Sequence, residues 1–325
     1  MSDEPVENYD VVVIGGGAAG LEGALMLARS RRTVLVTDAG APRNAPAEGV
    51  HGFLTRDGLP PAELTAIGRD EVRRYGGHIV DAAVTDARRT GDGFTVTLAD
   101  GRAVRARRLL VATGLTDELP DVPGLRDRWG RDVLHCPYCH GWEISDRPVG
   151  VLATGPMSVH QALLFRQWTD DVVLLQHTGP EPDAWQRERL EARGIRIVPG
   201  RVESLTVTDD RLIGVRLADG TAVDREALVV APTFVANVDA LTSLGLDTEL
   251  EPVSGGRYVP ADQFGATKVP GVWAAGNVTD VKAQVIGATA GAALAAVAIN
   301  NDLVTEDTEL AVTAQRSRNP KGDNR

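Results

Sequence analysis

The sequence predicts an α/β protein built from two Rossmann-like domains, each with three layers (ββα). Two observations carry this prediction. An apolar, β-branched run at residues 9–14 enters a glycine-rich turn, and residues 21–29 then read as a helix. The same order recurs later, where residues 149–152 lead into a second turn and a helix through Trp168. Because strands that alternate with helices form doubly wound parallel sheets, each occurrence predicts one such domain.

The first turn has the spacing G-x-G-x-x-G and reads Gly15-Gly16-Gly17-Ala18-Ala19-Gly20. In this pattern Gly15 makes the tight turn, Gly17 lets a pyrophosphate approach the backbone, and Gly20 lets helix and strand pack closely. The next strand, residues 33–37, ends at Asp38, where a ribose-binding carboxylate is expected. The alternatives are an ordinary glycine turn, and Asp38 as a turn residue. With strand, helix and carboxylate together, the unit predicts a dinucleotide site at a helix N-terminus.

The second turn, Ala153-Thr154-Gly155-Pro156-Met157-Ser158, has lost this pattern. Ala153 and Ser158 occupy two of the glycine positions, and Pro156 removes an N–H group from the loop. The following strand, residues 172–175, ends in Gln176-His177-Thr178, without the arginine that a 2′-phosphate favours. The second domain therefore has the expected fold of a nucleotide-binding domain, while NADPH binding there is doubtful.

The only two cysteines, Cys136 and Cys139, are separated by two residues and are followed by His140. Such thiols can close into a disulfide ring, and a helix start beneath them would lower the pKa of the first. An imidazole can take the proton that an attacking thiol must lose; a histidine bonded to backbone is the alternative. The two cysteines could instead be half of a zinc site, but the chain has no further cysteine to complete the four ligands. They could also be packed in the core, but Pro137 and Gly141 favour an exposed turn. We therefore predict Cys136, Cys139 and His140 as catalytic residues, and no metal.

Three aromatic or imidazole side chains near this segment have open roles. His135 could tune the first thiol, or its ring could be bonded to a carbonyl at the end of a strand. Trp129 and Trp142 could wall a substrate pocket, or they could be ordinary core residues.

The amino-acid composition limits which kinds of partner the protein is expected to bind. The chain has 34 basic and 45 acidic residues, a net charge of −11 without long runs of one sign, which argues against nucleic acid. Apolar stretches such as residues 287–297 are too short to span a membrane. Residues 1–8 are polar and acidic and do not resemble a secretory signal, so a cytoplasmic location is expected. Two cysteines in a reducing compartment are more often catalytic than structural.

The rest of the chain suggests where one domain passes into the other. Residues 93–98 and 103–109 predict an antiparallel insert, and the proline-containing turn at residues 119–124 marks a crossing. An alanine-rich helix is expected at residues 283–299, before a polar tail that we expect to be disordered. The predicted division is residues 8–117 and 244–303 for one domain, 118–243 for the cysteine-bearing domain, and 304–325 for the tail.

The order of these motifs resembles low-molecular-weight thioredoxin reductases over roughly residues 8–303. More narrowly, three segments are similar to the flavin-dependent dithiol oxidases of gliotoxin and holomycin biosynthesis: Cys136-Pro-Tyr-Cys-His-Gly-Trp-Glu143, Asp38-Ala-Gly-Ala-Pro-Arg-Asn44 and Gly276-Asn-Val-Thr-Asp280. The resemblance implies a homodimeric FAD protein whose FAD-binding domain is split by the cysteine-bearing domain. It places the following residues around FAD: Gly15, Gly17, Ala18, Ala19, Gly20, Asp38, Ala39, Arg43, Asn44, Ala112, Thr113, Gly114, Gly276, Asn277, Gln284 and Val285.

The chain departs from the reductases at two positions. They usually carry an aspartate where this chain has Asn277, and another directly after the second cysteine, where this chain has His140. The second departure favours a base that deprotonates thiols.

The resemblance also implies a mechanism. Cys139 would lie nearest the flavin and Cys136 would be the interchange thiol, attacked by a small-molecule dithiol while O2 reoxidises the flavin to give H2O2. Two alternatives remain: a disulfide reductase that uses NADPH or another donor, and a flavin-binding redox sensor in which the cysteines act as a switch.

Overall fold

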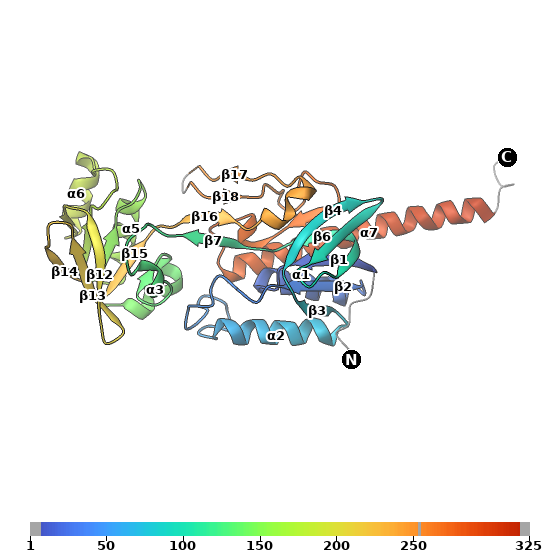
Figure 1. The fold of residues 1–325 in the computed structure, drawn as a ribbon, viewed down its shortest axis with the longest axis horizontal. Coiled ribbons are helices and arrows are strands. Elements are labelled where there is room, and N and C mark those ends of the chain that lie inside the picture. The colour runs from blue at the N-terminus through green and yellow to red at the C-terminus, as the bar shows by residue number, and fades with distance from the viewer. Residues whose placement is uncertain (1–7, 253–254, 319–325) are drawn as a thin grey trace.

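Two parallel β-sheets form the two halves of the molecule, and a pair of antiparallel strands connects them (Figure 1). The computed structural model describes residues 8–252 and 255–318. Each half carries helices on one face of its parallel sheet and an antiparallel sheet on the other. The predicted fold class, two Rossmann-like domains with the first split by the second, is confirmed.

In the first half, the central strand β1 (Asn8–Ile14) is buried on both faces. Val11 and Val13 face one hydrophobic core and Val12 and Ile14 the other, because successive side chains of a strand point to opposite faces. The parallel strands follow the order β3 (His78–Asp81), β2 (Val34–Asp38), β1, β6 (Ala103–Val111) and β19 (Val272–Ala274).

Small residues allow the helices of this half to pack closely. α1 (Ala18–Arg29) lies against α7 (Val285–Arg318) through fully buried alanines, and Val72 of α2 (Pro61–Arg74) joins the same core. α1 begins at Ala18, earlier than the predicted segment 21–29, because Gly17 is already its N-cap. The opposite face is covered by β4 (Val84–Thr90), β5 (Gly93–Leu98) and the start of β6, where the antiparallel insert was expected.

The second half repeats the plan. Its parallel sheet has the order β11 (Arg196–Val198), β10 (Val172–Leu175), β9 (Val149–Leu152), β15 (Ala227–Val230) and β8 (Val133–Leu134). Helices α5 (Ser158–Phe165) and α6 (Ala184–Ala192) share one core with this sheet. The opposite core is closed by β12 (Val202–Thr208), β13 (Arg211–Leu217) and β14 (Ala222–Asp224). α5 ends at Phe165, short of the predicted Trp168.

The connection between the halves is short. Strand β7 (Leu115–Glu118) leaves the first half and pairs with β16 (Thr233–Ala236), which returns to it. β7 directly precedes the proline-containing turn at residues 119–124, and two short strands, β17 (Glu249–Leu250) and β18 (Arg257–Tyr258), extend the pair into a small sheet. The two halves are thus held together by few backbone connections, and their facing surfaces enclose the site described below.

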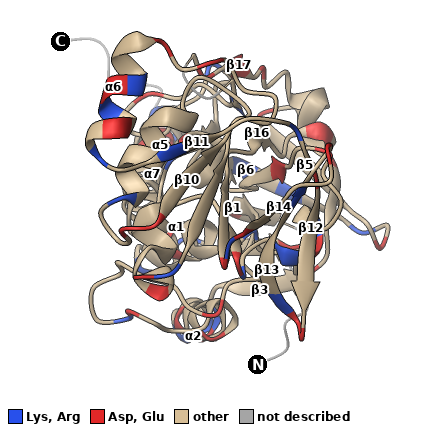
Figure 2. Ribbon diagram, turned by 90° about the vertical axis from the view of Figure 1, so that its left-hand side faces the viewer, with Lys and Arg blue, Asp and Glu red and all other residues tan. Residues whose placement is uncertain are grey.

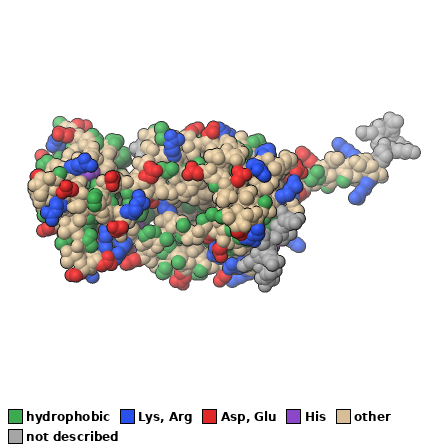
Figure 3. All heavy atoms as spheres, in the orientation of Figure 1, with side chains coloured by type: hydrophobic (Ala, Val, Ile, Leu, Met, Phe, Trp, Pro, Cys, Tyr) green, Lys and Arg blue, Asp and Glu red, His purple; other side chains and the backbone are tan. Residues whose placement is uncertain are grey.

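The prediction of a disordered tail from residue 304 is wrong for the residues that the structure describes, because α7 continues to Arg318. Arg107 and Arg108 on β6 form ion pairs with Asp302, Glu306 and Asp307 of this helix, and these pairs hold it to the sheet. Beyond them the helix is exposed and projects from the body (Figures 1 and 3). Residues 319–325 of the predicted tail lie outside the described residues.

Because of this extension, α7 is the one helix of the described chain that is long and apolar enough to cross a membrane, by length and composition alone. In the first half of this helix, Ala288, Ala292 and Ala295 are buried in the core against α1, whereas Ile286, Leu294 and Val297 are exposed. Figure 2 shows acidic and basic residues interspersed along the chain of the second half.

Candidate active site

A cavity of about 1320 Å3 lies between the two halves. The glycine turn after β1 and the ends of β2 and β6 line one side, whereas the cysteine segment and the turn after β9 line the other. Ligands of open α/β sheets bind outside the carboxyl ends of the strands, which is where this cavity lies. One space therefore joins the predicted dinucleotide site to the predicted redox pair.

The glycine turn leaves the start of α1 open to the cavity. Gly15 has a φ of 113°, a left-handed conformation that favours glycine. A Cβ on Gly20 would collide with the Gly15 carbonyl, so Gly20 permits the close packing that was expected. A Cβ on Gly17 would instead meet nothing within 4 Å, and Gly17 caps α1 without a side-chain hydrogen bond. The free N–H groups of this turn suit a pyrophosphate.

Asp38 lies at the end of β2 and lines the cavity, as predicted. Its Oδ1 accepts from the Gly40 N–H at 2.9 Å, and its Oδ2 accepts from Arg69 at 3.0 Å. Arg69, which also pairs with Asp81, was not found from the sequence, because it reaches Asp38 only through the packing of α2. A carboxylate has further acceptor sites, so Asp38 can still bind a ribose hydroxyl.

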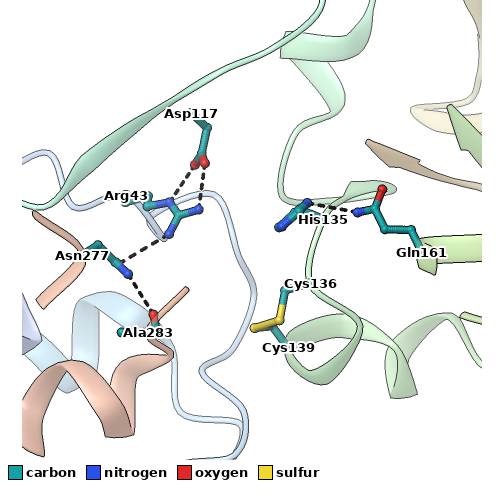
Figure 4. The surroundings of a disulfide bond; sticks show 8 residues. All are labelled: Arg43, Asp117, His135, Cys136, Cys139, Gln161, Asn277 and Ala283. Atoms are coloured by element: carbon teal, nitrogen blue, oxygen red, sulfur yellow. Dashed lines mark hydrogen bonds and ion pairs between the residues drawn. A yellow bond between two sulfur atoms is a disulfide. The ribbon is translucent and has the colours of Figure 1, made fainter. Parts of the chain in front are cut away.

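Arg43 and Asn277 form a polar network on the same side of the cavity (Figure 4). Arg43 makes two 2.7 Å bonds to the Asp117 carboxylate, and its Nη1 is 3.4 Å from Asn277 Oδ1. Asn277 Nδ2 donates to the carbonyl oxygens of Asp280 and Ala283, at 3.0 and 2.9 Å. An aspartate could not donate to these carbonyls, which explains why asparagine suits this position.

The remaining residues predicted to contact FAD divide into two groups. Thr113 lies at the end of β6, and its Oγ1 is buried without a hydrogen-bond partner, as expected of a group that meets a ligand. Gly20 and Gly276 do not line the cavity, and they contribute through packing. Those that line it are Gly15, Gly17, Ala18, Ala19, Asp38, Ala39, Arg43, Asn44, Ala112, Thr113, Gly114, Asn277, Gln284 and Val285. The open helix start and the unpaired hydroxyl fit FAD.

Cys136 and Cys139 form a disulfide whose Cα atoms are 5.3 Å apart. Cys136 is the N-cap of the short helix α4 (Pro137–His140), in which Pro137 takes the first position that proline favours. The cysteines line the cavity, and Figure 4 shows the disulfide facing Asn277 and Ala283 across open space. The redox pair is thus directed at the proposed flavin site.

His140 ends α4 beside this disulfide and also lines the cavity. Burial lowers the pKa of its imidazole below the usual 6.5, and this effect outweighs the opposing charge of Glu143; nearby His51 lowers it further. Both ring nitrogens are buried and have no hydrogen-bond partner among the described residues. The backbone-bonded alternative therefore does not describe His140, which is a neutral imidazole able to accept a proton.

His135 precedes Cys136 and lines the cavity too. Its Nδ1 lies 3.0 Å from the Val230 carbonyl oxygen and 3.2 Å from Gln161 Nε2. Burial lowers its pKa, and the ring packs edge-on against Phe234. The carbonyl contact expected at a strand end is present, together with a second contact to Gln161 that the sequence did not suggest.

The tryptophans differ in position. Trp129 lines the cavity, whereas Trp142 does not line it and is 80% exposed, so neither a pocket wall nor a core position describes Trp142. The short 3-10 helix Trp142–Ile144 directs Ile144 into the core and leaves Trp142 outside.

The turn after β9 is closed on itself. The Ser158 hydroxyl lies 3.2 Å from the Thr154 N–H and 3.4 Å from the Gly155 N–H, and accepts from both. After β10, the Gln176 side chain donates to the carbonyls of Gly179 and Pro180. Two backbone donors of this turn, the N–H groups of Thr154 and Gly155, are therefore already paired with Ser158.

A glycine turn for a dinucleotide, a redox disulfide on a second Rossmann-like domain and one cavity between them define a disulfide oxidoreductase of the flavoprotein class. A profile of the pyridine nucleotide-disulphide oxidoreductase family matches residues 9–316, and the chain belongs to this family. Membership makes the protein an oxidoreductase and implies FAD binding.

Individual relatives agree with this assignment. Thioredoxin reductase aclD of Aspergillus oryzae is 32% identical over 311 residues, covering 92% of this chain and 98% of aclD. Thioredoxin reductase tcpT of Claviceps purpurea is 33% identical over 289 residues, covering 82% and 86%. Among solved structures, HlmI is 48% identical with a TM-score of 0.89, covering 96% of this chain and 97% of HlmI. An oxidoreductase from Agrobacterium tumefaciens is 37% identical with a TM-score of 0.86, covering 92% and 99%.

Proposed function

We propose that the protein is an FAD-dependent dithiol oxidase that forms a disulfide in a small-molecule dithiol and uses O2 as the electron acceptor. One observation carries this proposal: the second nucleotide turn is capped by Ser158, although it lines the same cavity as the redox disulfide. With the N–H groups of Thr154 and Gly155 already paired, this turn offers a pyrophosphate fewer donors, which makes NADPH a poor electron source and a thiol substrate the better one. The motifs shared with known dithiol oxidases support the same reading.

The disulfide supplies the chemistry. One substrate thiol loses its proton to an imidazole, for which we predicted His140, and the thiolate attacks Cys136 Sγ. The Cys136–Cys139 bond breaks, Cys139 leaves as a thiolate, and substrate and Cys136 share a mixed disulfide. The second substrate thiolate then attacks the substrate sulfur of that bond, which closes the product disulfide and releases Cys136. The substrate has lost two electrons and the cysteine pair has gained them.

FAD, when bound, would supply the redox chemistry that returns the cysteines to the disulfide and delivers the two electrons to O2. The sum is dithiol plus O2 giving disulfide plus H2O2. Protein groups that would hold it are the open start of α1, Asp38, Arg43 and Thr113.

The proposal is tested by mixing the purified holoenzyme anaerobically with a small dithiol or with NADPH while following flavin absorbance. We expect the dithiol, but not NADPH, to bleach the flavin absorbance. Admitting air should then restore the absorbance and yield one H2O2 for each disulfide formed. Fast bleaching by NADPH would instead make the protein a thioredoxin-type disulfide reductase, the alternative function. If no dithiol reduces the flavin, the remaining alternative is that the protein is a redox sensor. Cys139→Ser serves as the control, because it removes the disulfide and blocks reduction through it.

A further inference from the structure

His135 presents its two ring nitrogens to different surroundings. Nδ1 faces the Val230 carbonyl and the side chain of Gln161, as Figure 4 shows for Gln161. The other nitrogen, Nε2, is directed into the space between Arg43 and the disulfide (Figure 4). Nε2 has no hydrogen-bond partner among the described residues, so this nitrogen is open to a ligand in the cavity.

The two contacts at Nδ1 call for opposite tautomers. The Val230 carbonyl oxygen, at 3.0 Å, can accept only if the hydrogen of a neutral ring lies on Nδ1, whereas the amide nitrogen of Gln161, at 3.2 Å, can donate only if it does not. The hydrogen is assigned to Nδ1, because the carbonyl can only accept whereas the carboxamide can turn. Nε2 then keeps its lone pair and is the basic atom. A hydrogen bond of this kind sets the tautomer of a histidine in many functional sites.

Gln161 can reinforce this tautomer in only one orientation. A protonated Nδ1 has no lone pair, so the carboxamide must present its oxygen to the ring; this requires a half-turn of the amide, whose two atoms have nearly the same shape. Gln161 is 7% exposed, and its Oε1 otherwise has no partner among the described residues. After a half-turn, Oε1 shares the Nδ1 hydrogen with the Val230 carbonyl and can stabilise the imidazolium that forms when Nε2 takes a proton.

We propose that Gln161 is a positioning residue that, through His135, sets up proton transfer at Cys136. This inference rests on the proposed oxidase function and adds a second base to it. His140 takes the proton of the first substrate thiol, whose thiolate bonds to Cys136 Sγ while Cys139 leaves as a thiolate. His135 Nε2 takes the proton of the second substrate thiol, whose thiolate closes the product disulfide, and His135 returns this proton to the departing Cys136 thiolate. Each cysteine thus has its own histidine.

Two charges face His135: Arg43 from the loop after β2 and Asp117 from β7. Arg43 lowers its pKa and Asp117 raises it, but burial is the largest effect and the Val230 bond opposes it. Arg43 and Asp117 are paired with each other, so they form a nearly neutral unit next to the ring. The hydrogen bonds at Nδ1 therefore have the larger influence on the orientation of the imidazole.

Two substitutions separate this role from simple packing. Gln161→Met keeps the volume and removes both amide atoms, whereas Gln161→Glu keeps an acceptor and removes the donor. Gln167→Met is the matched control, since Gln167 is exposed just beyond α5. The rates to measure are anaerobic flavin reduction by a dithiol between about pH 5.5 and 9, and alkylation of Cys136 by iodoacetamide in a reduced Cys139→Ser background.

We expect Gln161→Met to slow dithiol-driven reduction at least about tenfold near pH 7 and to change the acid limb of the profile. Gln161→Glu should keep the rate within about threefold and move that limb to higher pH, because a carboxylate stabilises the imidazolium. The alkylation profile of Cys136 should follow the same order, and Gln167→Met should match the parent. Equal profiles for all variants, or equal losses in Met and Glu, would overturn the inference. A parent enzyme that no dithiol reduces would instead refute the oxidase function.

Discussion

His51 Nε2 lies 3.3 Å from Glu143 Oε1, and this contact bridges the two halves of the molecule. His51 follows the loop after Arg43 in the first half, whereas Glu143 directly follows the cysteine segment in the second. A close packing of Gly130 on Pro46 lies between the same two halves. Together these contacts join the two halves and hold the disulfide beside the cavity.

Glu143→Gln removes the charge from this bridge. Because the pair is partly exposed, we expect less than about 1 kcal/mol of lost stability. The larger effect should be local, with faster amide hydrogen exchange in the loop that carries His51 and slower flavin reduction by dithiol. Glu226→Gln is the matched control, since Glu226 pairs with Arg147 at the same 3.3 Å but within one half. Equal exchange in both variants would show that the bridge does not hold the halves.

Gly17→Val and Gly155→Val separate the two nucleotide turns. Neither residue has the left-handed conformation, and a Cβ on either meets nothing within 4 Å, so both variants should fold. The new side chain of Gly17→Val would enter the pyrophosphate position, and we expect most of the FAD to be lost on gel filtration. Gly155→Val should retain its flavin. Flavin retained in both would argue against the assigned pyrophosphate position.

The pH dependence of dithiol oxidation should expose His140. Its lowered pKa keeps the imidazole neutral at pH 7, so the parent should lose activity only as the pH falls below about 6.5. His140→Ala should be slowest, relative to the parent, at low pH. The deficit should shrink toward the thiol pKa of about 8.5, where thiolate forms without a base. A deficit that is constant across pH would remove His140 from proton transfer.

The same buried imidazoles affect stability. The folded-state pKa values of His135 and His140 lie below 6.5, so below about pH 6.5 the unfolded chain binds more protons than the folded one. The free energy of unfolding should therefore fall as the pH drops from about 6.5 toward the folded-state values. Urea denaturation at several pH values measures this, and His140→Asn should reduce the slope. An unchanged slope would mean that His140 titrates normally.

Asn277→Asp tests the amide network. A carboxylate would face the carbonyl oxygens of Asp280 and Ala283 and could donate to neither. We expect a loss of about 1 to 3 kcal/mol, offset in part by a stronger contact with Arg43. Thermal unfolding and flavin content measure both effects. A variant as stable as the parent would show that the asparagine is not needed for its donors.

Local sequence patterns predicted most of the elements around the site. The strands β9 and β10 have the predicted bounds, because their continuous apolar runs are bordered by turn residues. The C-terminal part of α7 was missed, since its polar composition resembles a disordered tail. Its stability depends on ion pairs with Arg107 and Arg108, which lie nearly 200 positions earlier in the chain.

By itself the sequence determined the two nucleotide-binding units, the redox cysteines and the loss of the second glycine pattern, because each depends on residues a few positions apart. Only the tertiary structure decided that both turns and the disulfide share one cavity, that Ser158 closes the second turn, and that Gln161 and Val230 meet His135. These contacts join segments that are distant in the chain or depend on side-chain direction. Their geometry follows from how the two sheets pack, which local spacing does not encode.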